Sequence, residues 1–213
     1  MEFSQLLQIV ADEPVFETGL LLAGQAQAND VRRQLSRWTA AGRLYQLRRG
    51  LYTLAPPFQK IKPHPFVMAN RLVRGSYVSC QSALAYHSLI PEHAPVVTSV
   101  GAARPIQWET ALGRFEFRHI KAELLWGYQW VELGDKQQAF VAAPEKALLD
   151  LAHLQRGGDD IDYLRALRLQ NLERLNLDEL QRQAQRAQSA KLRRAARRIL
   201  ELAQDEARHY ITL

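Results

Sequence analysis

The residues with the clearest binding chemistry are arginines in an acid-free stretch near the start of the chain. All six basic residues among positions 1–57 lie between positions 32 and 49, and no Asp or Glu lies among them. Arginine pairs with phosphate groups, and its fork of N–H donors matches O6 and N7 of guanine in the major groove of DNA. The stretch therefore predicts contact with DNA. The candidate contact residues are Arg32, Arg33, Ser36, Arg37, Arg43, Arg48 and Arg49.

A second acid-free run of basic residues lies between positions 180 and 200, on an expected helix. Leu192, Ala196, Ile199 and Ala203 fall on one side of that helix, and arginines take the other. A charged helix face is usually only solvated, but this one could also touch a partner protein or a nucleic acid. The candidate contacts here are Arg186, Lys191, Arg193, Arg194, Arg197 and Arg198.

Motifs for catalysis, metal binding or cofactor binding do not occur. The six histidines show no HExxH or paired metal spacing, and the single Cys80 can form neither an intramolecular disulfide nor a cysteine metal site. No glycine-rich phosphate loop or GxSxG elbow is present. Asp159, Asp160 and Asp162, next to two glycines, favour a helix cap over a cation site. We therefore expect no catalytic residue, no metal and no cofactor.

The scaffold that would position the first arginines is predicted to begin with three helices. Hydrophobic periodicity predicts a first helix over residues 3–12, and Thr18 is expected to cap a short second helix. Asn29 or Asp30 is expected to cap a third helix, which ends near Gly42.

A hairpin with a basic tip is predicted to follow, with strands over residues 44–47 and 51–54. On the third helix Val31, Leu35 and Trp38 turn inward, so the arginines of that helix project from the opposite side. Three helices followed by a hairpin is the order of a winged helix-turn-helix, whose third helix enters the major groove.

Four prolines between positions 55 and 65 predict a break after the hairpin, because proline interrupts both helices and strand pairing. We expect a winged helix over residues 1–57, a linker over 58–65, and an α+β domain over 66–213 with a helical tail from about 157. Within that domain, helices are expected over 65–73 and 83–89 and from Pro144 to His153. Strands are expected over 96–100, 114–120, 128–132 and 138–141, in a largely antiparallel sheet.

Four stretches together resemble the AbiEi family antitoxins of bacterial type IV toxin–antitoxin systems, also described as regulators of viral defence. They read VRRQLSRWTAAGRLYQLRRGLYTL, SYVSCQSALAYHSLIP, VTSVGAARPIQW and AFVAAPEKALLDLAHL, and the resemblance covers residues 15–154. It implies a winged helix that represses its own operon and a C-terminal domain that neutralises a nucleotidyltransferase-like toxin encoded next door. In at least some members this happens without a stable toxin complex.

The function expected from the sequence is that of a DNA-binding autorepressor and antitoxin. Its partners would be operator DNA, with inverted repeats read by two copies, and the toxin. One alternative is a one-component regulator whose C-terminal domain senses a small ligand without any toxin. Another is an enzyme acting on nucleic acid, with the basic tail as its substrate track.

The composition fits a folded protein that meets an anionic partner. The formal net charge is +6, the isoelectric point is about 9.7, and 47% of residues are hydrophobic. No run approaches 18 uninterrupted apolar residues, and residues 1–10 lack the features of a signal peptide. We therefore expect a cytoplasmic protein without a membrane partner.

Overall fold

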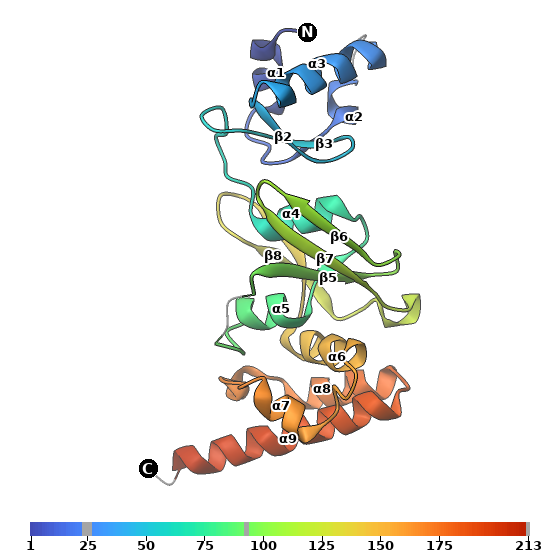
Figure 1. Cartoon of the computed structure of the whole chain (residues 1–213). Coiled ribbons are helices and arrows are strands. Elements are labelled where there is room, and N and C mark those ends of the chain that lie inside the picture. Colours follow the sequence, from blue (N-terminus) through green and yellow to red (C-terminus); the bar gives the residue numbers. More distant parts are fainter. Residues whose placement is uncertain (23–26, 92–93, 212–213) are drawn as a thin grey trace.

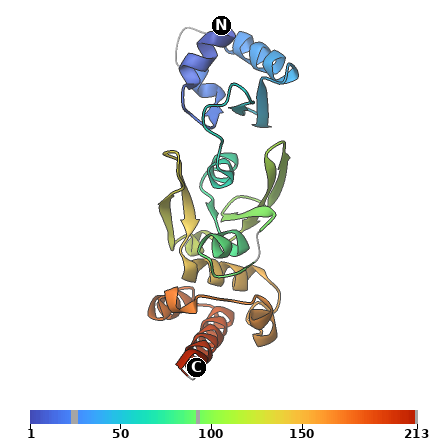
Figure 2. The ribbon, with the colours of Figure 1, turned by 90° about the vertical axis from the view of Figure 1, so that its left-hand side faces the viewer.

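The computed structural model describes residues 1–22, 27–91 and 94–211. The chain forms a mixed α+β structure that is stacked along one long axis (Figure 1). Small helices and a hairpin form one end, a twisted sheet forms the middle, and a layer of helices forms the other end. The view turned by 90° shows the same order of layers (Figure 2).

The N-terminal end combines three helices with a small antiparallel sheet. The helices are α1 (Phe3–Val10), α2 (Thr18–Leu21) and α3 (Ala28–Ala40). The sheet has the strand order β1-β3-β2, formed by β1 (Phe16–Glu17), β2 (Leu44–Arg48) and β3 (Leu51–Leu54). The predicted helices and hairpin are confirmed, whereas the short strand β1 had no recognisable signal.

Two predicted helix caps are wrong. Glu17 precedes α2, and Thr18 is the first residue of that helix. Gln27 precedes α3, so Asn29 and Asp30 lie within the first turn, and no side chain caps the helix. The end of α3 is as predicted, because Gly42 adopts the left-handed φ of 68° that terminates a helix.

The central sheet has six strands in the order β6-β7-β5-β4-β9-β8. The three pairs β4–β5, β6–β7 and β8–β9 are antiparallel, but β5–β7 and β4–β9 are parallel. The expected largely antiparallel sheet is therefore corrected to a mixed one. The cause is that β7 inserts between β5 and β6, so strands that follow one another in sequence are not all neighbours in space. The strands are β4 (Tyr77–Val78), β5 (Val96–Gly101), β6 (Ile106–Thr110), β7 (Gly113–His119), β8 (Tyr128–Glu132) and β9 (Gln138–Ala142).

The helix α6 (Pro144–Leu154) lies between the sheet and the C-terminal helices (Figure 1). Its residues 145–152 are all buried, because α5 and the sheet cover one side and α8 and α9 cover the other. Within the described residues, no helix is long and apolar enough to cross a membrane. The remaining helices are α4 (Pro65–Leu72), α5 (Cys80–Tyr86), α7 (Ile161–Ala166), α8 (Leu177–Arg186) and α9 (Ala190–Ile211), with single 3-10 turns at Ala122–Leu124 and Leu172–Arg174.

The helix α5 begins three residues earlier than expected. Cys80, its first residue, has a φ of 52°, and Ser79 before it gives no side-chain cap. By contrast, α4 and α6 begin at Pro65 and Pro144 as predicted, since proline fits the first turn of a helix.

A buried polar cluster joins α6 to β4. Lys146 and Asp150, one turn apart on α6 and each 2% exposed, form an ion pair. The Tyr77 hydroxyl and the Ser79 hydroxyl both donate to Oδ2 of Asp150, at 3.0 and 2.7 Å. Burial raises the pKa of Asp150, and the Lys146 ammonium opposes that shift. The carboxylate thus has partners for both oxygens, as a buried charge requires.

The main hydrophobic core crosses the expected linker. Val15, Leu47 and Leu51 of the N-terminal end belong to the same core as Val67 and Met68 of α4. Residues 55–64 form no helix or strand. The hairpin therefore packs against the middle of the molecule through Leu47 and Leu51. The separate N-terminal core comprises Leu6, Val10, Phe16, Leu21, Val31, Leu35, Leu44, Tyr52 and Leu54.

Removing one member of the buried pair should destabilise the whole fold. We expect Asp150→Ala to lower the free energy of unfolding by about 3–5 kcal/mol, because it leaves the Lys146 charge buried without a partner. Urea denaturation measures the loss. Glu201→Ala is the matched control, since Arg197 and Glu201 form an exposed pair of the same i,i+4 spacing that is worth about 0.3–0.5 kcal/mol. Equal losses in the two variants would contradict the role given to the cluster.

The partly buried histidines should make the protein less stable as the pH falls below about 6.5. Burial lowers the pKa of His87, as it does for His64 and His153. The unfolded chain therefore takes up protons on these groups first, so their contribution to stability is present above the unfolded pKa and is lost below it. We expect the free energy of unfolding to change less between pH 7.5 and 5.5 in His87→Gln than in the parent. The same pH dependence in His87→Gln and in the parent would contradict this role of His87. The titration of Asp150 does not affect the comparison, because both proteins contain that residue.

Candidate nucleic-acid interface

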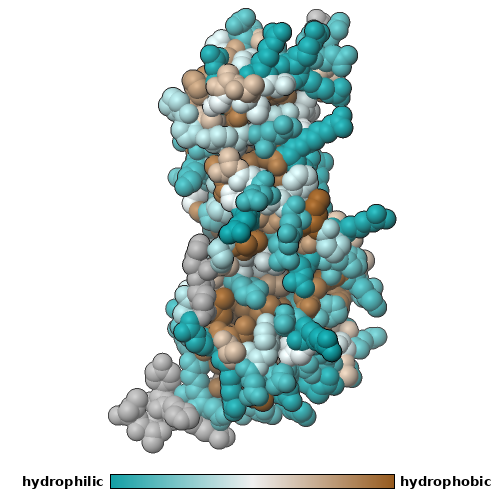
Figure 3. Space-filling model, viewed as in Figure 1, coloured by the Kyte–Doolittle hydropathy of each residue, from teal (hydrophilic) through white to brown (hydrophobic). Residues whose placement is uncertain are grey.

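The helix α3 presents its arginines to solvent at the end of the molecule farthest from α9 (Figure 1). Val31 and Leu35 are buried in the N-terminal core, and the half-buried Trp38 packs edge-on against Phe3 with ring centroids 5.3 Å apart. The predicted inward and outward faces of this helix are confirmed. Long hydrophilic side chains project from this end in the space-filling view (Figure 3). We call the exposed set Arg32, Arg33, Ser36 and Arg37 the α3 face.

The charges of the α3 face are only weakly neutralised. Arg33 pairs with Asp30 at 2.6 Å, but the two side chains are 71% and 59% exposed. Such an exposed pair contributes about 0–1 kcal/mol, so a phosphate group can replace the carboxylate at little cost. Arg43, also exposed, places its guanidinium 5.0 Å from the centre of the Phe3 ring, just beyond the end of α3.

Arg48 of the hairpin points toward the middle of the molecule instead of outward. Its guanidinium donates to the carbonyls of Leu72 and Arg71, at 3.0 and 3.2 Å, and lies 3.9 Å from the carboxylate of Glu17. These carbonyls lie at the C-terminal end of α4, where a cation is favoured. The expected DNA contact by Arg48 is therefore replaced by a structural role. Arg49, its neighbour at the tip, is exposed.

Three basic residues of the tail also have structural partners. Lys191 donates to the carbonyls of His153 and Gln155 and so caps the end of α6. Arg194 pairs with the Asp159 carboxylate at 2.8 Å, and Arg198 donates to the carbonyl of the same residue. Asp160, not Asp159, caps α7. The basic side of α9 thus fastens this helix to the preceding loop.

The remaining basic residues of the tail divide into two kinds. Arg186 lies 4.9 Å from the ring centre of Trp126, and the Lys146 ammonium lies 4.6 Å from the same ring centre. Arg193 and Arg197 are exposed, and Arg197 makes only a loose pair with Glu201 at 3.9 Å. Arg186, Arg193, Arg194 and Arg197 are all exposed, so these four remain candidate contacts for a partner.

Cys80 and Ser82, two side chains of nucleophilic type, are both engaged in the interior of the fold. Cys80 is buried, which raises the pKa of its thiol and keeps it protonated. The hydroxyl of Ser82 donates to the carbonyl of Val96 and accepts from the amide of Thr98. No group of three or more His, Cys, Asp or Glu residues that could hold a metal ion occurs in the part that the structure describes.

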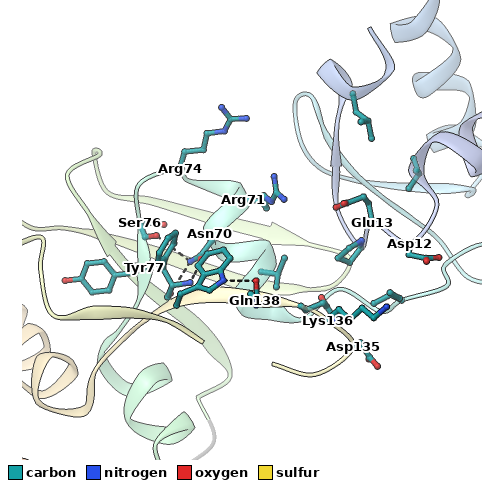
Figure 4. A pocket seen from close by; sticks show the side chains of 18 of the residues that line it. Asp12, Glu13, Asn70, Arg71, Arg74, Ser76, Tyr77, Asp135, Lys136 and Gln138 are labelled. Atoms are coloured by element: carbon teal, nitrogen blue, oxygen red, sulfur yellow. Dashed lines mark hydrogen bonds between the residues drawn. The ribbon is translucent and has the colours of Figure 1, made fainter. Parts of the chain in front are cut away.

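A cavity between the N-terminal end and the sheet was missed by sequence reasoning. Its volume is about 1060 Å³, and its walls come from α1, α4, β8, β9 and the loops beside them (Figure 4). The signal that could have found it is the alternation of Tyr128 and Trp130 on an expected strand, because such alternation puts both rings on one face.

Comparisons with other proteins give no further assignment. No family model matches the chain, and a search of curated proteins found no significant match.

The role of Arg48 can be separated from that of its exposed neighbour. We expect Arg48→Ala to lower the free energy of unfolding by about 1–3 kcal/mol, because its bonds to the α4 carbonyls are charge-assisted. Arg49→Ala should stay within about 0.5 kcal/mol of the parent, as exposed substitutions do. Urea denaturation of both variants measures the difference. If only Arg49→Ala lowered the free energy of unfolding, the bonds from Arg48 to the α4 carbonyls would not be what stabilises the hairpin.

Proposed function

We propose that the chain is a DNA-binding transcriptional autorepressor that reads its operator with the α3 face. The exposed arginines of that face, set on a helix with a buried opposite side, are the observation that carries the proposal. In this proposal the three helices and the sheet β1-β3-β2 act as a winged helix-turn-helix. Arg49 contributes from the hairpin, and Arg43 contributes from the end of α3.

The dimensions and chemistry of α3 suit a major groove. A helix of 13 residues is about 20 Å long, and the major groove of B-DNA, about 12 Å wide, admits an α-helix. Arginines at successive turns can bind backbone phosphates and guanine edges at the same time. Because the hairpin packs inward through Arg48, the helix carries most of the contact in this proposal. Two copies would read an inverted repeat.

We also propose, from the family resemblance, that the protein neutralises a nucleotidyltransferase-like toxin. The resemblance is carried by segments that include β4 and α6, which contain the buried polar cluster. Exposed surfaces of the sheet and of α9 would then be available to the toxin. Expression of the adjacent reading frame, alone and together with the full chain, tests this through growth rescue.

A one-component regulator without a toxin is the second candidate, and the cavity between the N-terminal end and the sheet favours it. A ligand bound there would touch both parts of the protein. If the neighbouring gene product is harmless to growth, this candidate replaces the antitoxin proposal, while DNA binding by α3 is unaffected.

The α3 face should account for operator binding. We expect Arg33→Ala combined with Arg37→Ala to weaken binding to the promoter DNA of its own operon by about 30-fold or more, since each good arginine contact is worth about 1–3 kcal/mol. Fluorescence anisotropy at several salt concentrations measures this, and affinity should fall as salt rises because phosphate contacts release counterions.

The matched control is Arg193→Ala combined with Arg197→Ala, which removes two exposed arginines of the tail. This variant should bind the promoter as the parent does. The α3 variant should still relieve toxicity in the growth assay. Equal loss of binding in the two double variants, or none in the α3 variant, would contradict the proposal.

A further inference from the structure

The cavity between the N-terminal end and the sheet collects most of the exposed large hydrophobic side chains of the described residues. Ile9 and Leu20 come from the N-terminal end, while Tyr128, Trp130 and Phe140 come from the sheet, and each is at least 40% exposed. Large apolar side chains that gather in one hollow mark a binding site more strongly than scattered ones. The volume of about 1060 Å³ slightly exceeds the usual size of small-molecule sites, which is about 300–1,000 Å³.

The sheet wall of this cavity is a platform of aromatic rings. Trp130 on the edge strand β8 lies opposite Phe140 on β9, with ring centroids 4.4 Å apart. Tyr128 contacts Phe140 at 5.6 Å and stacks on the buried Tyr77 at 4.5 Å. Trp130 is 53% exposed, and its indole N–H donates to the side-chain oxygen of Gln138 at 2.7 Å. The ring is therefore held in place while much of its surface stays open, as stacking with a planar ligand requires.

The anchoring of β9 keeps this platform in place. The side-chain amide of Asn70, on α4, accepts from the backbone amide of Phe140 at 2.6 Å and donates to its carbonyl at 3.4 Å. Figure 4 shows Asn70 at the base of the cavity, with these bonds drawn as dashed lines. The platform and α4 are thus fixed relative to each other before any ligand binds, which lowers the entropic cost of binding.

Charged groups of both signs lie around the platform. Arg71 on α4 and Arg74 just after it line the cavity, and Asp12 and Glu13 lie on the facing wall (Figure 4). Arg74 pairs with Glu17 at 2.5 Å, but the Arg74 side chain is 73% exposed, so an anion can compete for it. The ligand that fits must therefore combine a planar ring, an anionic group and hydrogen-bond donors.

We propose that this cavity binds a nucleotide whose base carries an amino group. The base would stack on Trp130 with its edge toward Phe140, because these two rings are tilted by 60°. Its phosphate would pair with Arg71 and Arg74, and its amino group would donate to the Glu13 carboxylate. Asp12 already pairs with Lys60 at 3.2 Å, so the donor of the ligand is aimed at Glu13. A simple aromatic acid offers Glu13 no donor, whereas the amino group of a nucleotide base does. This assignment does not depend on DNA binding by α3, although the ligand would contact the part of the chain that carries α3.

Titration of the full chain with AMP, GMP and a single-stranded octanucleotide tests the proposal. We expect saturable binding by calorimetry together with quenching of tryptophan fluorescence. Trp130→Ala and Arg71→Ala should each weaken binding by about tenfold or more, the usual effect of losing one base-stacking ring or one charged phosphate contact. Tyr86→Ala and Arg104→Ala are the matched controls, since both residues are exposed outside this cavity, and both should bind as the parent does.

The three probes distinguish a free nucleotide from a nucleotide within a single strand. Binding of AMP or GMP that is lost in Trp130→Ala indicates a free nucleotide, and binding of the octanucleotide alone, with the same loss, indicates a nucleotide within a strand. Binding that survives in Trp130→Ala and Arg71→Ala, or no binding of any of the three probes, would overturn the proposal. The variant Arg33→Ala with Arg37→Ala must retain nucleotide binding, which keeps this result separate from the test of the α3 face.

Discussion

Lys146 and Asp150 form their ion pair within α6, the helix whose residues 145–152 are all buried between the sheet and the C-terminal helices. Asp150 also accepts hydrogen bonds from Tyr77 and Ser79, so the pair fixes the register of α6 against β4. The Lys146 stem fills the space beside Gly127, whose φ of 73° is one that glycine tolerates best. Sheet, α6 and C-terminal helices therefore depend on one set of polar contacts, and a single uncompensated charge there would disturb all three.

The N-terminal end is fastened to this core by its hairpin. Leu47 and Leu51 enter the main core, and Arg48 binds carbonyls at the end of α4. The hairpin side of the N-terminal end is thus packed against the rest of the protein, and the arginines of α3 are exposed to solvent. The same packing creates the cavity beside α1 and β8. In the proposed function, the surface that meets DNA and the cavity that meets a ligand are two consequences of how this hairpin packs.

Local features of the structure could be predicted from sequence, and long-range partners could not. Periodicity located α3 and its two faces, and prolines marked the starts of α4 and α6. Nothing in the sequence pairs Ser79 with Asp150, which are 71 residues apart. The strand β6 was not predicted, although apolar and polar residues alternate over positions 106–109. Arg48 and Lys191 resemble free surface charges in sequence, since their partners are backbone carbonyls that no residue type reveals.

Arginine footprinting on the full chain tests the central claim most directly. Phenylglyoxal modification, read by mass spectrometry with and without the promoter DNA of its own operon, reports which guanidinium groups the DNA covers. The account predicts protection of Arg32, Arg33 and Arg37 and unchanged modification of Arg193 and Arg197. Protection of the two tail arginines while the α3 face stays reactive would contradict it.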